Sequence, residues 1–278
     1  MTRLSFLIDV TRCSGCYNCF MACRDEHYAN DYPGYSAPQP LSGQFWMQLN
    51  EVERGAYPRP RLDYVPISCQ HCAEAPCMEA ALDGAVYRRD DGIVIIDPVK
   101  AKGQRQIVKA CPYRVVCWNE ELEVPQKCAM CAHRLDAGDK QPRCSEACPT
   151  GAMVFGDLDD PRSEISQRVA ALATEVLHPE YGCSPLVLYH GIPKRFVAGE
   201  VLLGDADDVC AKGVRVSLDG EGVRAETTSD VFGLFEFEGL AQSAVYRITV
   251  THPGYGPWEA DVKTHTDVDL GQIVLAAS

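Results

Sequence analysis

The sequence predicts an α+β protein in which a cysteine-rich part, built as one module inserted into another, precedes an all-β domain. Three observations predict this arrangement. Thirteen of the 15 cysteines fall between Cys13 and Cys148, and twelve of these stand in runs of regular spacing. The first and last of these runs enclose the others. From Phe196 onward the spacing is absent, and short alternating apolar runs are broken by Gly, Asp and Pro, as is typical of strands.

The first cysteine run is the clearest motif of the chain. It reads Cys13-Ser-Gly-Cys16-Tyr-Asn-Cys19-Phe-Met-Ala-Cys23. Three thiols at every third residue and a fourth after a gap of three have the ligand spacing of [4Fe–4S] proteins. In proteins with two such clusters, the fourth cysteine of a run binds the other cluster. The run therefore predicts a partner run elsewhere in the chain.

Two other uses of cysteine compete with this interpretation. A disulfide framework is disfavoured, because thiols packed this closely rarely have the Cα separations that disulfides need. Pairs such as Cys69-Gln-His-Cys72 and Cys128-Ala-Met-Cys131 would suit zinc if each stood alone. The four-cysteine run, and the Cys-Pro steps that end two later runs, favour iron–sulfur clusters.

A second run, Cys69-x2-Cys72-x4-Cys77, is one ligand short, because Ala81 stands where the fourth cysteine is expected. Residues 84–97 then predict two short strands around an Asp-Gly turn, as in a ferredoxin-like hairpin. The second run can therefore give three ligands to one cluster and none to its neighbour.

Cys111, followed by proline, ends a third run whose other positions hold no ligand. Counted back by the spacing of the first run, these positions are Ala101, Gln104 and Ile107. The fourth position of a run serves the other cluster, which we call the exchange rule, so these three positions belong with Ala81 to a single cluster. The chain therefore lacks all four ligands of one cluster and keeps the full set of its neighbour, a pattern that favours clusters over zinc.

The fourth run is Cys128-x2-Cys131-x12-Cys144-x3-Cys148, followed by proline. Exchange between the first and fourth runs, and between the second and third, predicts three [4Fe–4S] clusters. The predicted ligands are Cys13, Cys16, Cys19 and Cys148 for cluster one, Cys23, Cys128, Cys131 and Cys144 for cluster two, and Cys69, Cys72, Cys77 and Cys111 for cluster three. The outer module then comprises residues 1–62 and 119–160, and the inner module residues 63–118.

Some cysteines and histidines stand outside these sets. Cys117, Cys183 and Cys210 are expected to be buried and inert, because a free thiol packs as a small apolar group. His71 and His133 lie within or just after ligand runs. We expect them beside the ligands or facing solvent, since twelve cysteines already satisfy three clusters.

Residues 161–195 are predicted to form a helix and a connector that complete a first domain of residues 1–195. Asp160 is the expected N-cap of the helix, and Pro161 its first residue. An apolar stripe at helical spacing follows: Ile165, Val169, Leu172 and Val176. From His178 the segment is rich in Pro and Gly.

Residues 196–278 predict an all-β domain, a sandwich or small barrel. The predicted strands are Val197–Leu203, Val214–Leu218, Arg224–Thr228, Leu234–Glu238, Tyr246–Thr251, Trp258–Lys263 and Val268–Leu275. This part holds no paired catalytic carboxylates, no nucleophile constellation and no phosphate loop, so it is expected to serve in structure or docking.

Charge and hydropathy exclude several classes of function. The net charge is −13, and residues 196–278 hold 5 Lys and Arg against 14 Asp and Glu, which disfavours a nucleic-acid surface. No apolar stretch is long enough for a membrane span. The apolar run near the start is too short for a signal peptide. We therefore expect a cytoplasmic protein, with export alongside a partner left open.

The runs, together with Cys144-Ser-Glu-Ala-Cys148-Pro-Thr-Gly-Ala and Phe155-Gly-Asp-Leu-Asp-Asp-Pro-Arg-Ser, resemble the iron–sulfur subunits of the dimethyl sulfoxide reductase family of molybdenum enzymes. The resemblance covers residues 1–195. Members of that family usually hold four clusters, and this chain departs from them at the four missing ligands. The segment Thr228-Ser-Asp-Val-Phe-Gly-Leu-Phe-Glu-Phe makes the last domain similar to transthyretin-like modules.

Three clusters followed by such a β-domain resemble the small subunits of the pyrogallol–phloroglucinol transhydroxylase branch of that family. The resemblance implies an electron-transfer subunit without an active site of its own, from an anaerobe. Its partner would be a large catalytic subunit with a molybdenum or tungsten bis-pterin cofactor, acting on polyhydroxylated aromatics. The alternatives are a subunit of a catechol dehydroxylase or another molybdopterin reductase, a mainly structural or assembly subunit, and a free-standing polyferredoxin.

Overall fold

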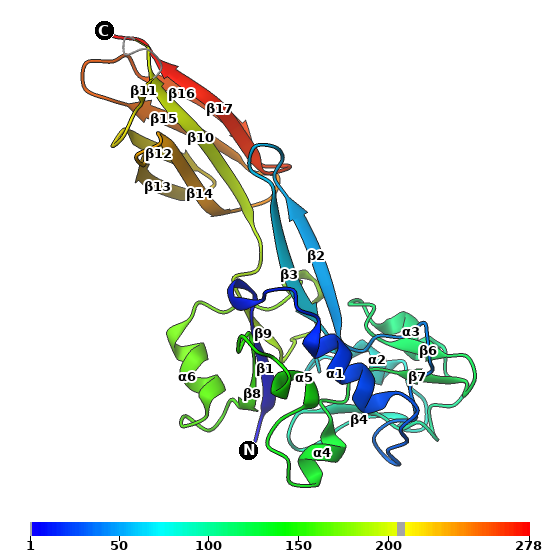
Figure 1. Ribbon diagram of the computed structural model, residues 1–278. Coiled ribbons are helices and arrows are strands. Elements are labelled where there is room, and N and C mark those ends of the chain that lie inside the picture. The colour runs from blue at the N-terminus through cyan, green and yellow to red at the C-terminus, as the bar shows by residue number, and fades with distance from the viewer. Residues whose placement is uncertain (1, 205–208) are drawn as a thin grey trace. The chain divides into compact units, whose positions relative to one another are not determined.

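The computed structural model describes residues 2–204 and 209–278, which form two compact units (Figure 1). The first unit comprises the residues up to Glu51 and Tyr64–Ile192. The second comprises Val52–Asp63 and Pro193–Ser278. All twelve predicted cluster ligands lie in the first unit. The second unit takes in a short segment from the first half of the chain, which the predicted division into residues 1–195 and 196–278 does not include.

A three-stranded sheet joins the beginning of the first unit to its end (Figure 1). In it, β1 (Leu4–Asp9) pairs antiparallel with β8 (Met153–Asp157) and parallel with β9 (Leu188–His190). The centre of β1 is fully buried, with Phe6 and Leu7 at 0% exposure. A single 3₁₀ turn, Val10–Arg12, separates this strand from the first cysteine run.

The helix α6 (Glu164–Ala171) packs on this sheet through Ile165, which shares a small apolar core with Leu7 and Val154. Gly156 in β8 permits this close approach. A Cβ atom at Gly156 would lie only 3.1 Å from Cγ2 of Ile165.

The start and end of this helix differ from the prediction. Ser163 is the N-cap, because its hydroxyl accepts a hydrogen bond from the N–H of Ser166. The expected cap, Asp160, instead accepts from the N–H of Arg162, two residues on, and so forms a turn before the helix. The helix ends at Ala171, so Val176 of the predicted stripe lies beyond it.

Five further helices lie in or beside the cysteine runs of the first unit. They are α1 (Asn18–His27), α2 (Pro76–Glu79), α3 (Gln106–Ala110), α4 (Ala132–Asp136) and α5 (Arg143–Glu146), accompanied by the 3₁₀ turns η1 (Val10–Arg12) and η2 (Pro179–Tyr181). Most are too short for a periodic apolar pattern to indicate them. In the described part of the chain, no helix has the length and apolar character needed to cross a membrane.

Two short hairpins complete the first unit. β4 (Val86–Arg88) pairs with β5 (Val94–Ile96), which confirms the two strands expected in residues 84–97. β6 (Cys117–Asn119) pairs with β7 (Val124–Gln126) just before the fourth cysteine run.

The second unit contains two four-stranded sheets. In the first sheet, β10 (Arg195–Leu203) pairs with β11 (Val209–Cys210), β14 (Leu234–Leu240) and β17 (Val268–Leu275). The second sheet has the order β13-β12-β15-β16, made of Val223–Thr228, Arg215–Gly220, Val245–Thr251 and Trp258–Lys263. All seven predicted strands are confirmed, and β11 is additional.

The two sheets share one apolar core. Val201 and Phe235 come from the first sheet, and Leu218, Ile248 and Val262 from the second. Along β12 and β15, buried and exposed residues alternate, because side chains of a strand point to opposite faces of its sheet.

A segment of the hairpin formed by β2 (Gln48–Arg54) and β3 (Arg61–Ile67) also belongs to the second unit. Asp267, whose side chain is 1% exposed, holds this segment to the β-strands. Its carboxylate accepts from the N–H of Gly55 at 2.9 Å and from the N–H of Phe196 at 3.0 Å. Buried carboxylates need such donors, so this contact fixes the segment in the second unit.

Candidate iron–sulfur cluster sites

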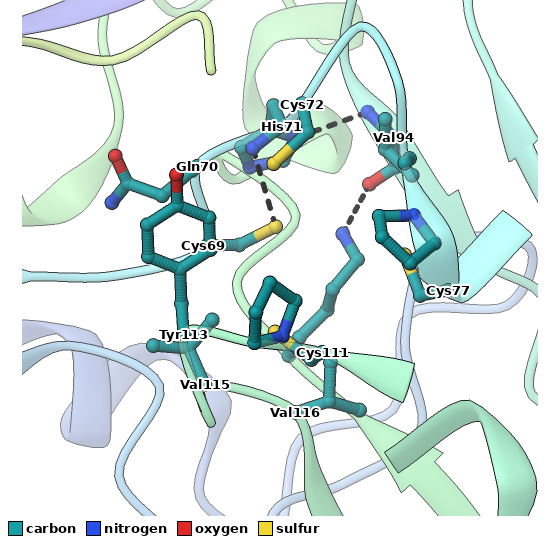
Figure 2. Close-up of a pocket in the computed structure, with 14 residues that line it drawn as sticks. Cys69, Gln70, His71, Cys72, Cys77, Val94, Cys111, Tyr113, Val115 and Val116 are labelled. Carbon is teal, nitrogen blue, oxygen red and sulfur yellow. Dashed lines mark hydrogen bonds between the residues drawn. The ribbon is translucent and has the colours of Figure 1, made fainter. Parts of the chain in front are cut away.

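Four cysteines of the inner module line one cavity of the first unit, together with His71, Tyr113 and Lys127 (Figure 2). These cysteines come from the second and third runs, which are separated by the β4–β5 hairpin. They are the predicted ligands of cluster three: Cys69, Cys72, Cys77 and Cys111.

The thiols of this set are positioned by turns and by the ends of short elements. β3 ends two residues before Cys69, and His71 then adopts a positive φ of 45°. The backbone N–H of His71 donates to Sγ of Cys69 at 3.4 Å. Pro76 begins α2, which carries Cys77, and Cys111 is the C-cap of α3. The short elements thus aim four thiols from distant parts of the chain at one space.

The protein environment disfavours free thiolates in this cavity. Burial raises the pKa of Cys77 to about 11 and raises the pKa of Cys72 still further. Neighbouring thiols, Cys69 and Cys111 among them, raise both values again, because like charges repel. A bound metal reverses this balance, since a coordinating thiol is deprotonated. The cavity therefore fits a group that brings positive iron to four buried sulfurs.

A second cavity lies at the start of the first cysteine run. Gly15 in this run has a φ of 67°, and a Cβ atom there would lie 2.5 Å from the ring of Tyr64. Only glycine therefore fits at this position. The thiols that line the cavity are those predicted for cluster one: Cys13, Cys16, Cys19 and Cys148.

Cys148 differs from Cys13 and Cys19, whose pKa values are raised mainly by burial. Burial also acts on Cys148, but hydrogen bonds from the backbone N–H groups of Met153, Thr150 and Ala152 lower its pKa overall. The hydroxyl of Thr150 lies 3.7 Å from the same sulfur. Donors to sulfur favour the charged thiolate and are one means of tuning a cluster.

The third set lies between helices of the outer module. α1 carries Cys23, α5 carries Cys144, and the two helices pack together. Burial, and then the thiols of Cys131, Cys23 and Cys128, raises the pKa of Cys144 well above its usual value. Burial, then Cys128 and Cys131, has the same effect on Cys23. The structure therefore brings together the four cysteines predicted for cluster two.

The three sets adjoin one another. After burial, the thiol of Cys69 is the largest cause of the raised pKa of Cys128, which relates the cluster three cysteines to those of cluster two. Burial, the other thiols of its own set and then Cys19 of cluster one raise the pKa of Cys144. Among the described residues, no three Cys, His, Asp or Glu side chains converge closely enough for a single metal ion. The thiols surround wider spaces instead.

The positions of the missing cluster are filled by packed side chains. Ala101 and Ile107 are fully buried, and they share an apolar core with Val86 and Ile96 of the neighbouring hairpin. Ala81 packs against the same core and is partly buried. The space is therefore occupied by hydrocarbon.

Gln104, the polar residue among the four, is bound by backbone groups. Its Oε1 accepts from the N–H of Leu82 at 2.8 Å, and its Nε2 donates to the carbonyl oxygens of Lys100 at 2.8 Å and Leu82 at 3.3 Å. The side-chain amide of Gln104 thus links the backbone at Leu82 to the backbone at Lys100. These hydrogen bonds close the loop at a position where a cluster would otherwise hold it.

The histidines near the runs lie beside the ligands rather than in solvent. His71 is fully buried, and its Nδ1 accepts from the N–H of Val94 at 3.0 Å. His133 lies 3.0 Å from Oε1 of Glu26 and stacks on Tyr32. No sequence pattern indicated a further neighbour, His27, whose Nε2 lies 3.8 Å from Sγ of Cys131.

The three remaining cysteines are not alike. Cys183 is 3% exposed, and its thiol donates to the carbonyl of Tyr181 at 3.3 Å. Cys117 and Cys210 are only partly buried. The expectation of burial is therefore confirmed for Cys183 and wrong for the other two, which lie on short paired strands at sheet edges.

Comparisons with known proteins support the iron–sulfur interpretation of the first unit. The family described as "4Fe-4S dicluster domain" matches residues 60–158. The small subunit of pyrogallol hydroxytransferase from Pelobacter acidigallici is 40% identical over 283 residues, which cover 99% of this chain and 100% of that subunit.

Other relatives match a smaller part of the chain. A putative dimethyl sulfoxide reductase iron–sulfur subunit from Halobacterium salinarum is 35% identical and covers 68% of this chain and 79% of its own length. A tetrathionate reductase subunit from Salmonella typhimurium is 36% identical and covers 70% of this chain and 75% of its own length.

Proposed function

Because the chain belongs to the iron–sulfur subunits of the dimethyl sulfoxide reductase family of molybdenum enzymes, we propose that it transfers electrons through three [4Fe–4S] clusters. The observation that carries this proposal is the grouping of the twelve cysteines into three adjoining sets, two of which line cavities. The filled positions around Ile107 support three clusters rather than four.

The ligands are those of the exchange rule. Two sets take their fourth thiol from a distant run, since Cys148 completes cluster one and Cys23 completes cluster two. The inner module supplies cluster three through Cys69, Cys72, Cys77 and Cys111. When bound, each cluster supplies reversible one-electron transfer.

The chain's own residues bury, position and hydrogen-bond the sulfurs. Burial of most thiols of clusters two and three would keep water from the iron, whereas Cys16 of cluster one is exposed. Backbone donors contact sulfur directly. Examples are the N–H of His71 toward Cys69 at 3.4 Å and the N–H of Met130 toward Cys128 at 3.3 Å. Such contacts, with net charge and burial, set the potential of a cluster within a span of about −700 to +450 mV.

The proposed partner is a large catalytic subunit with a molybdenum or tungsten bis-pterin cofactor, acting on polyhydroxylated aromatics. The support is the extent of the match. The pyrogallol hydroxytransferase small subunit matches 99% of the chain, whereas the other two relatives match 68% and 70%. A subunit of this kind has no active site of its own.

We also propose that the second unit is a transthyretin-like sandwich with a structural or docking role. Two four-stranded sheets around one core support the sandwich.

The test is the iron content and EPR spectrum of the purified native complex. We expect about twelve irons per copy of this chain, as three four-iron clusters require, beyond any iron of the partner. About sixteen irons would mean that a fourth cluster binds in spite of Ile107, and about four or none would contradict the proposed function. Mass spectrometry of the complex identifies the large subunit.

A further inference from the structure

Lys127 is a buried cation at the edge of the cluster three cavity. It is 3% exposed and lines the same cavity as the four cysteines of that site. Its Nζ donates to the carbonyl oxygen of Val94 (Figure 2) and, at 3.1 Å, to that of Cys128. No carboxylate in the described part of the chain forms an ion pair with it.

A buried ammonium group without a counter-charge is unfavourable. Removing a cation from water costs several kcal/mol unless an opposite charge and hydrogen bonds replace the lost hydration. The two carbonyl oxygens accept two of the three ammonium protons, but they carry no net charge. The third proton has no acceptor among the described residues. The anionic groups that the cavity can offer to Lys127 are the cysteine sulfurs.

Lys127 acts unequally on the three sites. After burial, which raises the pKa of Cys77, Lys127 is the next largest influence and lowers it. Its effect on Cys128 in site two comes only after burial, Cys69 and the N–H of Met130. Lys127 is not among the main influences on the pKa values of Cys13, Cys19 and Cys148, which are predicted ligands of cluster one.

We propose that the Lys127 ammonium group is the counter-charge of cluster three and raises the reduction potential of that cluster above the value that its ligands alone would give. This inference rests on the proposed function. Reduction would add one electron to the bound cluster, and dithionite supplies that electron in a titration. No bond is broken and no proton moves. The reduced cluster carries one more negative charge, so a fixed cation at short range stabilises it relative to the oxidised form.

Four variants of the native complex separate charge from packing. Lys127→Met removes the charge and keeps the length of the side chain, Lys127→Gln removes the charge and keeps hydrogen-bond donors, and Lys127→Arg keeps the charge. Lys109→Met is the matched control, since Lys109 lies two residues before Cys111 but is exposed, where solvent and salt screen its charge. Each variant is measured by iron analysis and by an EPR-monitored redox titration with dithionite.

In Lys127→Met and Lys127→Gln, we expect the potential of cluster three to become more negative, that of cluster two to shift less, and that of cluster one to stay constant. Lys127→Arg restores the potential of cluster three, and Lys109→Met leaves all three unchanged. If the neutral variants lose cluster three while Lys127→Arg retains it, the counter-charge role is also supported.

Two results overturn the inference. One is an unchanged potential of cluster three in a neutral variant that keeps all its iron. The other is loss of cluster three in Lys127→Arg as well as in the neutral variants, because shape rather than charge would then be required. Failure of the proposed function is recognised separately, since the unmutated complex would then lack three clusters.

Discussion

The inner module contains two places where the pattern of the cysteine runs predicts a set of four ligand positions, and the two differ in the side chains that fill them. One is a cavity lined by four thiols, and the other is packed with Ala81, Ala101, Gln104 and Ile107. In the first, burial and the neighbouring thiols disfavour thiolates unless a metal binds them, whereas the second is filled by packed side chains. The difference shows that removing a cluster requires more than removing its cysteines, because the vacated volume and the freed backbone groups must both be filled.

The largest effect is expected when a cysteine of the cluster three cavity is replaced. Cys69→Ala or Cys111→Ala removes a ligand of cluster three, so iron content should fall from about twelve to about eight per chain. Cys183→Ala, a buried thiol of the same apolar core, is the control and should keep all its iron. Full iron content in Cys69→Ala would show that this cysteine is not a ligand.

The packed place is tested by removing its largest hydrocarbon. Ile107→Ala deletes a fully buried side chain, which should lower the free energy of unfolding by about 2–5 kcal/mol without changing the iron content. Chemical denaturation of the complex measures this loss. Val99→Ala, at a side chain 84% exposed, is the control and should stay within about 0.5 kcal/mol of the unmutated protein. Equal effects of the two variants would contradict the packing argument.

A smaller loss is expected at the polar residue of the packed place. Gln104→Ala removes the hydrogen bonds to Leu82 and Lys100. This loss should lower the free energy of unfolding by about 1 kcal/mol. The measurement is again the denaturation midpoint, with the exposed Lys102→Ala as control. Gln104→Glu sharpens the comparison, because its second carboxylate oxygen cannot donate to the carbonyl of Lys100. No change in either Gln104 variant would mean that the loop needs no such closure.

The smallest effect concerns the link between the inner hairpin and the outer module. Hydrogen bonds from Arg89 and then Tyr35 lower the pKa of Asp136 to about 2. Because the folded pKa lies below the unfolded value of about 3.9, the carboxylate contributes its full stability above about pH 5 and loses it as the pH falls toward 2.

Asp136→Asn should therefore be less stable than the unmutated chain at neutral pH, by less than about 1 kcal/mol for a pair this exposed. The difference between the two denaturation midpoints should shrink as the pH is lowered from about 5 toward 2. A difference that stays constant over this range would show that Asp136 does not titrate with a lowered pKa.

The sequence predicted the parts of the fold that have a strong local pattern. The strands from Val197 to Leu275 alternate over five or more residues, and the structure confirms them almost to the residue. The grouping of thiols also followed from spacing, because the exchange rule links runs that are distant in the sequence.

Most of what the sequence did not indicate depends on contacts between distant residues, and one local feature was also assigned wrongly. The role of Ser163 as N-cap was missed because Asp160-Pro161 has the same local signature. The burial of Lys127 follows from its position beside the inner hairpin, and no motif marks it. The segment Val52–Asp63 belongs to the second unit through Asp267, more than 200 residues further along the chain.

The pairing of β1 with β8 and β9 has a consequence for the way the protein is made. Leu7 pairs with Val154 and with Leu188, so the first strand has no partner until most of the first unit exists (Figure 1). At a ribosomal rate of about 5–20 residues per second, Cys148 follows Cys19 by roughly ten seconds. During that interval the nascent chain contains Cys13, Cys16 and Cys19 without Cys148. The four cysteines proposed for cluster one are therefore complete only late in the synthesis of the first unit.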